Sequence, residues 1–335
     1  LYRTQRKCYS YLMKNQAGLK IVAIGGGHGL STALRGFKKI ASELIAIVTV
    51  ADDGGSSGAL RRDIGILPPG DIRNCMAALS DDEEFLTQVL QYRFPAESSV
   101  GGHNLGNLLL TALANITGSF EQGVNELSRL LSIHGKVIPS TLSDINLVAD
   151  VETERNGDKF VETIRGESMI TERNGRIIRL DIVPNDAAAN PAALREILSA
   201  DLIAMGPGSL YTSVLPNLKV RGIHQAIQAS HAKKIYVCNV STQPGETDHY
   251  TCYDHAKAIQ NALPNVRLDG IICNNNHEAP LSVPVQWVKI NKHLLSEFTV
   301  FQGDLIDDQH PWRHDSDKLA ATVVKAFQSG KANDK

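Results

Sequence analysis

The sequence predicts an α/β fold: a doubly wound, mostly parallel sheet with an inserted antiparallel β-segment. Three observations support this prediction. Short apolar runs alternate with helical patterns at both ends of the chain, which is typical of parallel strands joined by crossover helices. Glycine-rich loops follow several of these runs directly. Residues 136–183 break the pattern with short β-rich runs, which indicates a segment inserted into the sheet.

The predicted strands of the parallel sheet are short and apolar, and they lie at residues 20–24, 44–50, 202–205, 234–238 and 269–273. Between the second and third strands, residues 104–116 carry leucine and alanine at helical spacing, which predicts a helix packed on the sheet. A final helix is expected to begin near Asp315.

The inserted segment, residues 136–183, is expected to consist of β-hairpins. Its β-rich runs are divided by Asn156-Gly157 and by Asn174-Gly175, and this dipeptide is a strong signal for a two-residue hairpin turn. The remaining chain divides into an N-terminal arm, one α/β domain that contains the insert, and a polar tail, at residues 1–19, 20–328 and 329–335.

Composition and charge narrow the class of protein. The chain has 335 residues, of which 42% are hydrophobic, enough for a large buried core. Its 34 basic and 36 acidic side chains give a net charge of −2 without a basic run, so no nucleic-acid partner is expected. No stretch approaches the ~20 apolar residues of a membrane span. The five scattered cysteines form no CxxC pair, which favours a reduced, cytoplasmic setting.

Two glycine-lined loops follow the first two predicted strands. The first reads GGGHG at residues 25–29, and the second reads DDGGSSG at residues 52–58. Glycines let backbone N–H groups approach an anion closely, and a following helix points its positive end at the same place. The first loop alone could equally be a structural bend. Two adjacent carboxylates followed by Gly and Ser are poorly explained as a simple turn, so the pair of loops predicts a site for a nucleotide-like anion.

Asp52 and Asp53 are the candidate metal ligands. Beside a bound phosphate they could hold a hard cation such as Mg²⁺, and they would be catalytic only in a transferase. Ligand binding itself is expected to require no cofactor. A transition-metal site and a Ser-His-Asp hydrolase are not expected, because the chain has no HExxH motif, no Cys/His pairing and no G-x-S-x-G motif.

Two further glycine-rich segments read PPGDIRN at residues 68–74 and GGHNLGN at residues 101–107. In the first, Asp71 is expected to cap a helix whose first turn carries Arg73 as an anion clamp beside Asn74. In the second, His103 and Asn107 are four residues apart at a helix start and can face one ligand. A rigid turn and an ordinary helix start remain the alternatives for these two segments.

The segment at 101–107 is called the third segment, and the last two loops, called the fourth and fifth loops, follow the strands at 202–205 and 234–238. Residues 206–213, GPGSLYTS, combine a permissive backbone with hydroxyl groups at a helix start, which is typical of a phosphate cradle. A bulky side chain at Gly208 is expected to block the ligand and leave the fold intact. Residues 239–248, NVSTQPGETD, offer amides for a base or sugar, although an ordinary loop explains them equally well. Open parallel sheets bind ligands at the edge formed by the carboxyl ends of their strands, which is where these loops are expected to lie.

Together these motifs resemble the CofD-like family, whose 2-phospho-L-lactate transferase branch works in deazaflavin cofactor synthesis. They are similar in particular to its gluconeogenesis factor (YvcK) branch, to which NVSTQPGETD and Arg313-His314 are also similar. The resemblance covers about residues 20–328. The chain departs from the family pattern at His28, where threonine is expected, and at Ser241, where methionine is expected.

The resemblance implies a Rossmann-like core with a nucleotide site at the strand ends. For the YvcK branch it implies binding of UDP-sugars, such as UDP-N-acetylglucosamine or UDP-glucose, and a role in cell shape and peptidoglycan synthesis during growth on gluconeogenic carbon sources. The expected protein partners are a second copy of the chain, as a homodimer, and the cell-wall synthesis machinery. The residues expected to bind the ligand are Gly26, Gly27, His28, Gly29, Asp53, Gly54, Arg73, Asn74, His103, Asn104, Asn107, Gly206, Gly208, Ser209, Asn239, Thr242, Gln243 and Arg313.

Two functions from different classes remain open. The first is a regulator that senses a nucleotide sugar, with the first and fourth loops on the phosphates, the fifth loop near the base or sugar, and Arg313 closing the site. The second is a transferase of the 2-phospho-L-lactate type, in which Asp52 and Asp53 hold a metal and the acceptor. An NAD-linked dehydrogenase is disfavoured, because the first loop lacks the G-x-G-x-x-G spacing.

Overall fold

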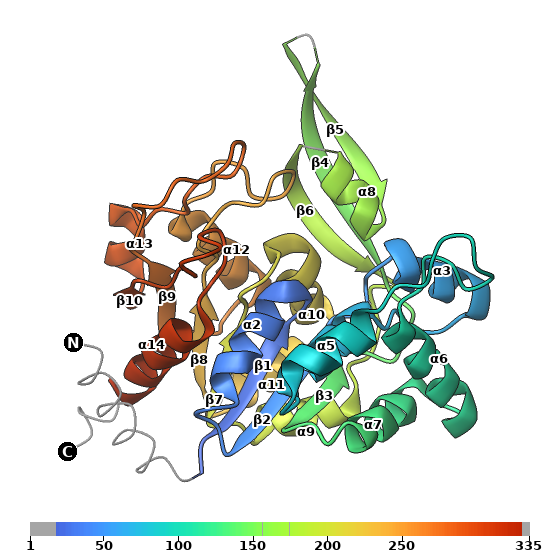
Figure 1. Cartoon of the computed structure of the whole chain (residues 1–335). Helices are drawn as coiled ribbons and strands as arrows, with labels where there is room; N and C mark the ends of the chain where they lie inside the picture. Colours follow the sequence, from blue (N-terminus) through green and yellow to red (C-terminus); the bar gives the residue numbers. More distant parts are fainter. Residues whose placement is uncertain (1–17, 156, 174, 330–335) are drawn as a thin grey trace.

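A seven-stranded sheet, in which every neighbouring pair of strands is parallel, forms the centre of the molecule (Figure 1). The computed structural model describes residues 18–155, 157–173 and 175–329. The strand order across the sheet is β10 (Val300–Gly303), β9 (Gly270–Asn274), β8 (Lys233–Val237), β7 (Leu202–Met205), β1 (Lys20–Gly25), β2 (Glu43–Val48) and β3 (Lys136–Pro139).

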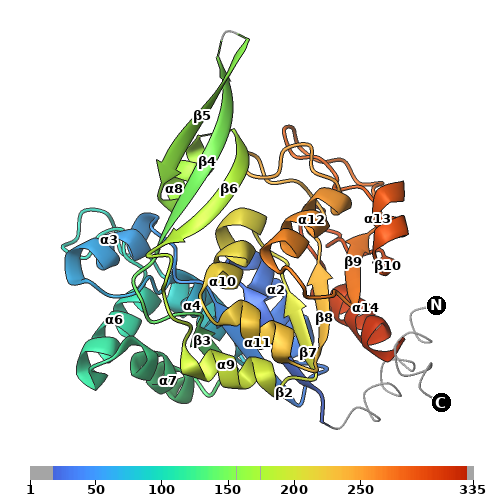
Figure 2. The ribbon, with the colours of Figure 1, turned by 180° about the vertical axis from the view of Figure 1, so that it is seen from behind.

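Helices cover both faces of this sheet, so its strands are buried on both sides and read as continuous apolar runs (Figures 1 and 2). In β1, Ile21 and Ala23 pack into one core, whereas Val22 and Ile24 pack into the other. The first core includes α2 (Gly27–Phe37), α4 (Gly70–Leu79) and α14 (Ser316–Gln328). The second includes α9 (Pro191–Leu198), α10 (Leu215–Lys219), α11 (Ile223–Ala229) and α12 (Cys252–Ala262).

All five predicted strands are present, displaced by at most two residues at either end. The predicted helix at 104–116 is α6 (Leu105–Thr117), and the predicted C-terminal helix is α14, which Asp315 caps. The prediction assigned β3 to the insert and missed β10, whose half-exposed residues do not form the apolar run that made the equally short β7 recognisable. Most of the predicted N-terminal arm and all but the first residue of the predicted tail lie outside the described residues.

The insert is smaller than predicted and is organised differently. Residues 136–139 form β3 of the main sheet, so the antiparallel sheet begins only at β4 (Asn146–Arg155). Its order is β5-β4-β6, with β5 at Asp158–Arg165 and β6 at Arg176–Val183. Gly157 lies in the β4–β5 turn, as expected for the first hairpin. The second hairpin prediction is wrong, because β5 and β6 both pair with β4 and the helix α8 (Glu167–Glu172) separates them.

The insert projects from the carboxyl-end edge of the main sheet, as Figures 1 and 2 show. The same edge carries α3 (Gly55–Ile64). The remaining helices are α5 (Glu83–Gln91), α7 (Phe120–Leu130), α13 (Lys292–Glu297) and the π-helical turn η1 (Leu210–Val214). Among the described residues, no helix combines the length and the apolar character needed to cross a membrane.

The topology fixes where a ligand site is expected. From β1 the chain moves to β2 and β3 on one side, and it returns to β7 on the other side of β1 before continuing to β10. The point between β1 and β7 is therefore the switch point of the sheet, where neighbouring loops separate and leave a crevice in open α/β folds. The first and fourth glycine loops follow these two strands.

Candidate functional site

The first and fourth glycine loops are in direct contact at the switch point. A Cβ atom placed on Gly29 would lie 2.7 Å from the Cα and N atoms of Gly208 and from the carbonyl carbon of Pro207. Gly208 itself has φ +152°, and a Cβ there would lie 3.1 Å from the carbonyl oxygen of Gly26. These glycines are needed for loop packing. The expectation that a bulky residue at Gly208 leaves the fold intact is therefore wrong.

The first loop opens into the N-terminus of α2, whose N-cap is Gly26 and has no side-chain capping bond. The Gly27 N–H donates to the Asp71 carboxylate. Asp71 was expected to cap α4, but that helix begins at Gly70 with Pro69 as its N-cap, so Asp71 lies in the first turn and reaches across to α2. Asp71 lies so close to Gly26 that a side chain would not fit at position 26, since a Cβ on Gly26 would lie 2.6 Å from Asp71 Oδ2.

Positive side chains gather around His28, the exposed residue of the first loop. Partial burial and the charges of Arg313, Arg35 and Arg73 all lower the pKa of His28, so these guanidinium groups act on one point at the start of α2. Arg35 is paired with Glu83, whereas the Arg313 side chain is exposed. Arg35 is neutralised by Glu83 and the Asp71 carboxylate lies at the same helix start, so Arg73 and Arg313, together with the positive end of the α2 dipole, are the groups that favour an anion at this loop.

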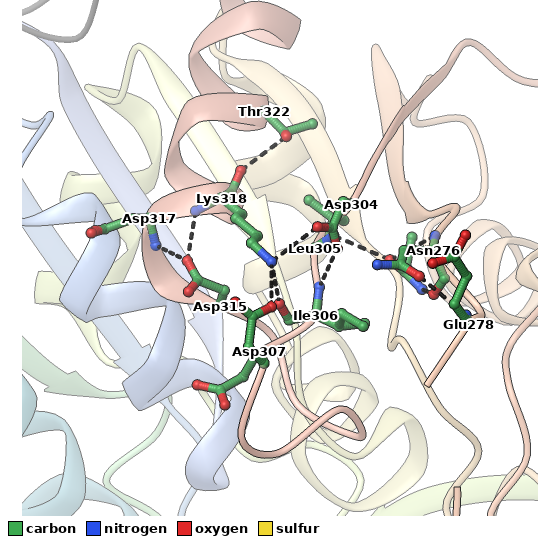
Figure 3. Close-up of polar contacts among 12 residues, drawn as sticks. Asn276, Glu278, Asp304, Leu305, Ile306, Asp307, Asp315, Asp317, Lys318 and Thr322 are labelled. Atoms are coloured by element: carbon green, nitrogen blue, oxygen red, sulfur yellow. Dashed lines mark hydrogen bonds and ion pairs between the residues drawn. The ribbon is translucent and has the colours of Figure 1, made fainter. Parts of the chain in front are cut away.

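A network of hydrogen bonds holds the segment that carries Arg313 (Figure 3). Lys318 Nζ donates to Asp304 Oδ2 and to the Ile306 carbonyl oxygen, each at 2.9 Å. Asp315 Oδ1 accepts from the backbone N–H of Lys318 at 2.8 Å and caps α14. The Arg313 N–H closes a turn onto the His310 carbonyl oxygen at 2.8 Å. The charge of Arg313 acts on His28 at the start of α2, and closure of a ligand site by Arg313 stays a prediction.

Arg73 joins the second and third glycine-rich segments to the site. Its Nη1 donates to Asn107 Oδ1 at 2.9 Å, and its Nη2 donates to Asn74 Oδ1 at 3.0 Å. Asn107 in turn donates from Nδ2 to Ser56 Oγ at 3.0 Å, and His103 Nδ1 lies 3.1 Å from the same hydroxyl. The amide of Asn107 is therefore used inside the protein, where it positions Arg73.

Asn104, also expected to bind the ligand, faces the protein instead. Its Nδ2 donates to the Gln91 carbonyl oxygen at 3.0 Å, and its backbone N–H lies 3.4 Å from Ser56 Oγ. Ser56 thus receives contacts from three residues of the third segment, a role that sequence analysis did not assign although its position in the DDGGSSG loop was noted. Asn104 has a structural role at the start of α6.

The guanidinium of Arg73 is buried with incomplete partners. Its residue is 9% exposed, and Nε is a buried donor that has no hydrogen-bond partner within the described chain. Its hydrogen bonds go to neutral amide oxygens, and among the described residues no carboxylate forms an ion pair with it. A buried charge is costly unless it is paired. The arrangement is therefore suited to an anionic ligand.

Asp52 and Asp53, the two carboxylates of the second loop, have different hydrogen-bond partners. Asp53 Oδ1 accepts hydrogen bonds from the backbone N–H and the hydroxyl of Ser168, at 3.0 and 2.8 Å, and so ties the loop to the start of α8. Asp52 Oδ1 accepts from the Gly54 N–H at 2.9 Å, a local turn contact. One oxygen of Asp53 thus accepts hydrogen bonds from the insert, which argues against Asp52 and Asp53 acting as two equivalent metal ligands.

A group of carboxylates gathers on the inner side of the second loop. Burial and the charge of Asp52 raise the pKa of Asp71 to about 6. Burial, followed by the charges of Asp52, Asp71, Glu246 and Asp53, raises the pKa of Glu167 to about 9. Sequence analysis missed Glu167, because the insert is far away in the chain and nothing in its own motif indicates a site.

Stability is expected to fall as pH rises, because Glu167 holds its proton more tightly in the folded state. The unfolded carboxyl titrates near 4.5 and the folded one at about 9, so between these values the folded state binds more protons and loses stability with increasing pH. The Glu167→Gln variant should therefore show a smaller drop in melting temperature between pH 6 and pH 9 than the parent. Glu172→Gln, at the exposed end of α8, is the control; an unchanged slope in Glu167→Gln would contradict the assignment.

The fourth loop offers fewer donors than predicted. Glu246, which is 4% exposed, accepts hydrogen bonds from the Tyr211 N–H at 3.3 Å and from Thr212 Oγ1 at 3.0 Å. The Gly206 N–H donates to the Ile24 carbonyl oxygen, and the Gly208 N–H donates to Asn239 Oδ1 at 3.3 Å. The Glu246 carboxylate therefore uses two donors at the start of η1, whereas phosphate binding by residues 206–209 stays a prediction. Gly206 and Gly208 shape the crevice.

The fifth loop is connected to the fourth by side-chain amides. Gln243 Nε2 donates to Ser209 Oγ at 2.6 Å, and Asn239 Nδ2 donates to Gln243 Oε1 at 3.0 Å. Thr242 forms two hydrogen bonds with the backbone of Gln286. Its N–H donates to the Gln286 carbonyl oxygen at 2.8 Å, and its Oγ1 accepts from the Gln286 N–H at 2.9 Å. Asn239, Gln243 and Ser209 thus come together as predicted, whereas Thr242 has a structural role.

A hollow of about 600 Å³ lies beside the fifth loop, and sequence analysis missed it. Its lining includes Tyr250, Trp287 and Lys289. Ser241 connects the hollow to the Arg313 segment, since it forms a β-bridge with Trp287 and donates from Oγ to the Trp312 carbonyl oxygen at 3.1 Å. Aromatic rings and a lysine beside the crevice are suited to an extended anionic ligand with a planar ring.

The fold and the site together define a doubly wound α/β protein with glycine-rich loops at the switch point of its sheet and arginines close to them. The family model described as 2-phospho-L-lactate transferase CofD matches residues 21–329 of the chain. The chain belongs to the CofD family. This confirms the family suggested by the sequence motifs.

Similar proteins are named gluconeogenesis factors. The chain is 41% identical to the gluconeogenesis factor of Bacillus subtilis, over 91% of this chain and 97% of the relative. It is 39% identical to that of Listeria innocua, over 96% and 100% of the two chains. A solved structure from Bacillus halodurans, described as a member of the upf0052 family, matches with a TM-score of 0.82 and 40% identity, over 92% and 99%. The predicted α/β fold is confirmed.

Proposed function

We propose that the protein binds a nucleotide sugar of the UDP-N-acetylglucosamine type and acts as a regulator of cell shape and cell-wall synthesis during gluconeogenic growth. The observation that carries the proposal is Arg73, a buried guanidinium without a carboxylate partner among the described residues, held by Asn107 and Asn74. The names of the relatives support the link to gluconeogenesis. The resemblance to the YvcK branch supports the UDP-sugar and the role in cell shape.

The diphosphate of the ligand would bind at the first loop. Arg73 and Arg313 supply cationic groups beside His28, and α2 adds the positive end of its dipole. A guanidinium matches the geometry of phosphate oxygens and can form two parallel hydrogen bonds with them. The amides of Asn239 and Gln243, with the hollow lined by Tyr250 and Trp287, would receive the base or the sugar.

Thermal stabilisation by a panel of ligands tests the proposal. UDP-N-acetylglucosamine and UDP-glucose are expected to raise the melting temperature, since a ligand at 100 times its Kd adds about 2.7 kcal/mol of stability. GDP and NAD serve as controls for the nucleotide and for a dinucleotide cofactor. Stabilisation by NAD alone, or by none of these ligands, would contradict the proposal.

A transferase of the 2-phospho-L-lactate type is the second candidate, and the carboxylates beside the second loop favour it. Asp52, Asp71 and Glu167 act electrostatically on one another, as the raised pKa values of Asp71 and Glu167 indicate. Carboxylate oxygens are the donors that Mg²⁺ prefers, and a cation there would relieve the repulsion. Asp52 and Asp71 would hold the ion, which would neutralise charge on a phosphoryl group. Asp53 would anchor the insert through Ser168.

Turnover distinguishes the two candidates. For a regulator, we expect no transfer product when the protein is incubated with Mg²⁺, a nucleotide-activated phospholactate and a deazaflavin acceptor. Robust turnover that Asp52→Asn lowers by orders of magnitude would instead establish the transferase. Asp53→Asn is the matched control, because its carboxylate binds Ser168 and its loss should affect mainly the position of the insert. The homodimer and the cell-wall partners are part of the same proposal and follow from the resemblance.

A further inference from the structure

Three cysteines that are far apart in the sequence meet in the core. Cys238 directly follows β8, Cys273 lies in the neighbouring strand β9, and Cys252 is the first residue of α12. Their Sγ atoms all lie within 4.8 Å of one another, and each residue is 0% exposed. This cluster lies beneath the fifth loop and is separate from the carboxylates of the second loop, so the proposed nucleotide site does not use it.

The three thiols are enclosed in the core, where the Cys252 thiol donates to the Val288 carbonyl oxygen at 3.5 Å. A bound cation would compensate the charge of three thiolates and release their protons, because metal binding by cysteine requires the deprotonated form.

A buried imidazole lies on the same helix as Cys252 but outside the sulfur cluster. His255 follows Cys252 by one helical turn on α12 and is 0% exposed. Its Nδ1 is 3.0 Å from the Thr251 carbonyl oxygen. Its ring nitrogens do not belong to the group of ligand atoms that lie within 4.8 Å of one another, so among the described residues this group consists of the three cysteines.

We propose that Cys238, Cys252 and Cys273 form a buried binding site for a thiophilic divalent cation, for which Zn²⁺ is the natural probe. Tetrahedral zinc–thiolate bonds of about 2.3 Å place the sulfur atoms roughly 3.8 Å apart. The sulfur atoms lie within 4.8 Å of one another, so each separation would shorten by at most about 1 Å to accept the ion. Three thiolates supply three of the four ligands of a tetrahedral zinc site. Such an ion would brace β8, β9 and α12 at the base of the fifth loop.

Metal titration of the whole 335-residue chain tests this site without reference to nucleotides. After reduction and removal of metals, the unmodified protein is expected to bind about one equivalent of Zn²⁺ in competition with a chromophoric chelator. Co²⁺ should give thiolate-to-metal charge-transfer absorption and the intense visible bands of tetrahedral coordination. Absence of both signals in the unmodified protein would overturn the proposal, as would a disulfide among the three cysteines in place of metal uptake.

Variants identify the ligands. Cys252→Ser and Cys273→Ser should each lose the tightly bound equivalent and the charge-transfer band. Cys75→Ser is the matched control, because Cys75 is an equally buried free cysteine in α4, outside the cluster. Circular dichroism checks that each variant folds. Zn²⁺ binding that Cys252→Ser and Cys273→Ser both retain would overturn the site.

Discussion

Replacement of Arg73 by alanine is expected to weaken the binding of UDP-N-acetylglucosamine by at least about 30-fold, because loss of one partner of a buried charge pair costs roughly 2–5 kcal/mol. Arg73 is the cation of the site that is both buried and held rigidly, through Asn107 and Asn74. Its effect should therefore exceed that of the exposed Arg313. Isothermal titration calorimetry measures the change in affinity.

Two controls separate a lost ligand contact from a damaged fold. Removal of the guanidinium leaves Asn107 Oδ1 without its donor, so circular dichroism should establish that the variant remains folded. Arg129→Ala removes an exposed arginine of α7, paired with Glu126, and should leave affinity unchanged. In Bacillus subtilis lacking its own gluconeogenesis factor, we expect this chain to restore growth on gluconeogenic carbon and the Arg73→Ala variant to fail. Equal affinity of the variant and the parent would remove Arg73 from the site.

The Gly29→Ala substitution, which adds a single methyl group, is expected to destabilise the protein and abolish ligand binding. The new Cβ would lie 2.7 Å from backbone atoms of Gly208 and Pro207, which are unable to yield as a flexible side chain would. Overpacking of this kind costs typically about 1–3 kcal/mol. Relief of the clash would separate the first and fourth loops and so change the crevice between β1 and β7. Urea denaturation and the ligand panel measure the two effects.

Gly25→Ala is the matched control for this prediction. Gly25 belongs to the same motif and is also buried, but a Cβ there would lie 3.6 Å from Leu30 Cβ, at ordinary van der Waals distance. The control should retain both stability and binding. If Gly29→Ala behaved like Gly25→Ala, direct packing of the two loops would not be needed for the site.

Four of the motifs, at residues 25–29, 52–58, 206–213 and 239–248, could be located from the sequence because each follows a strand with its own local pattern. The hydrogen-bond partners of the side chains in these motifs could not be predicted from the sequence. Asp53 was expected beside a phosphate and instead holds Ser168 of α8. Glu246 lies in the fifth loop, which the sequence predicts. Its hydrogen bonds at the start of η1 depend on the contact between the fourth and fifth loops, which the sequence does not reveal. Such pairings join residues far apart in the chain, and local sequence carries no information on which ones will meet.

The sequence by itself determined the parallel sheet, its glycine loops and the family, because apolar periodicity and strand-end motifs are local properties that the backbone expresses wherever the strands lie. Only the tertiary structure decided which loops share a crevice, since strand order brings β7 next to β1 and so places residues 206–208 against Gly29. It likewise brought three cysteines without a recognisable spacing into one cluster. The physical reason is that burial, charge compensation and hydrogen-bond partners are properties of neighbours in space, which the fold selects from the whole chain.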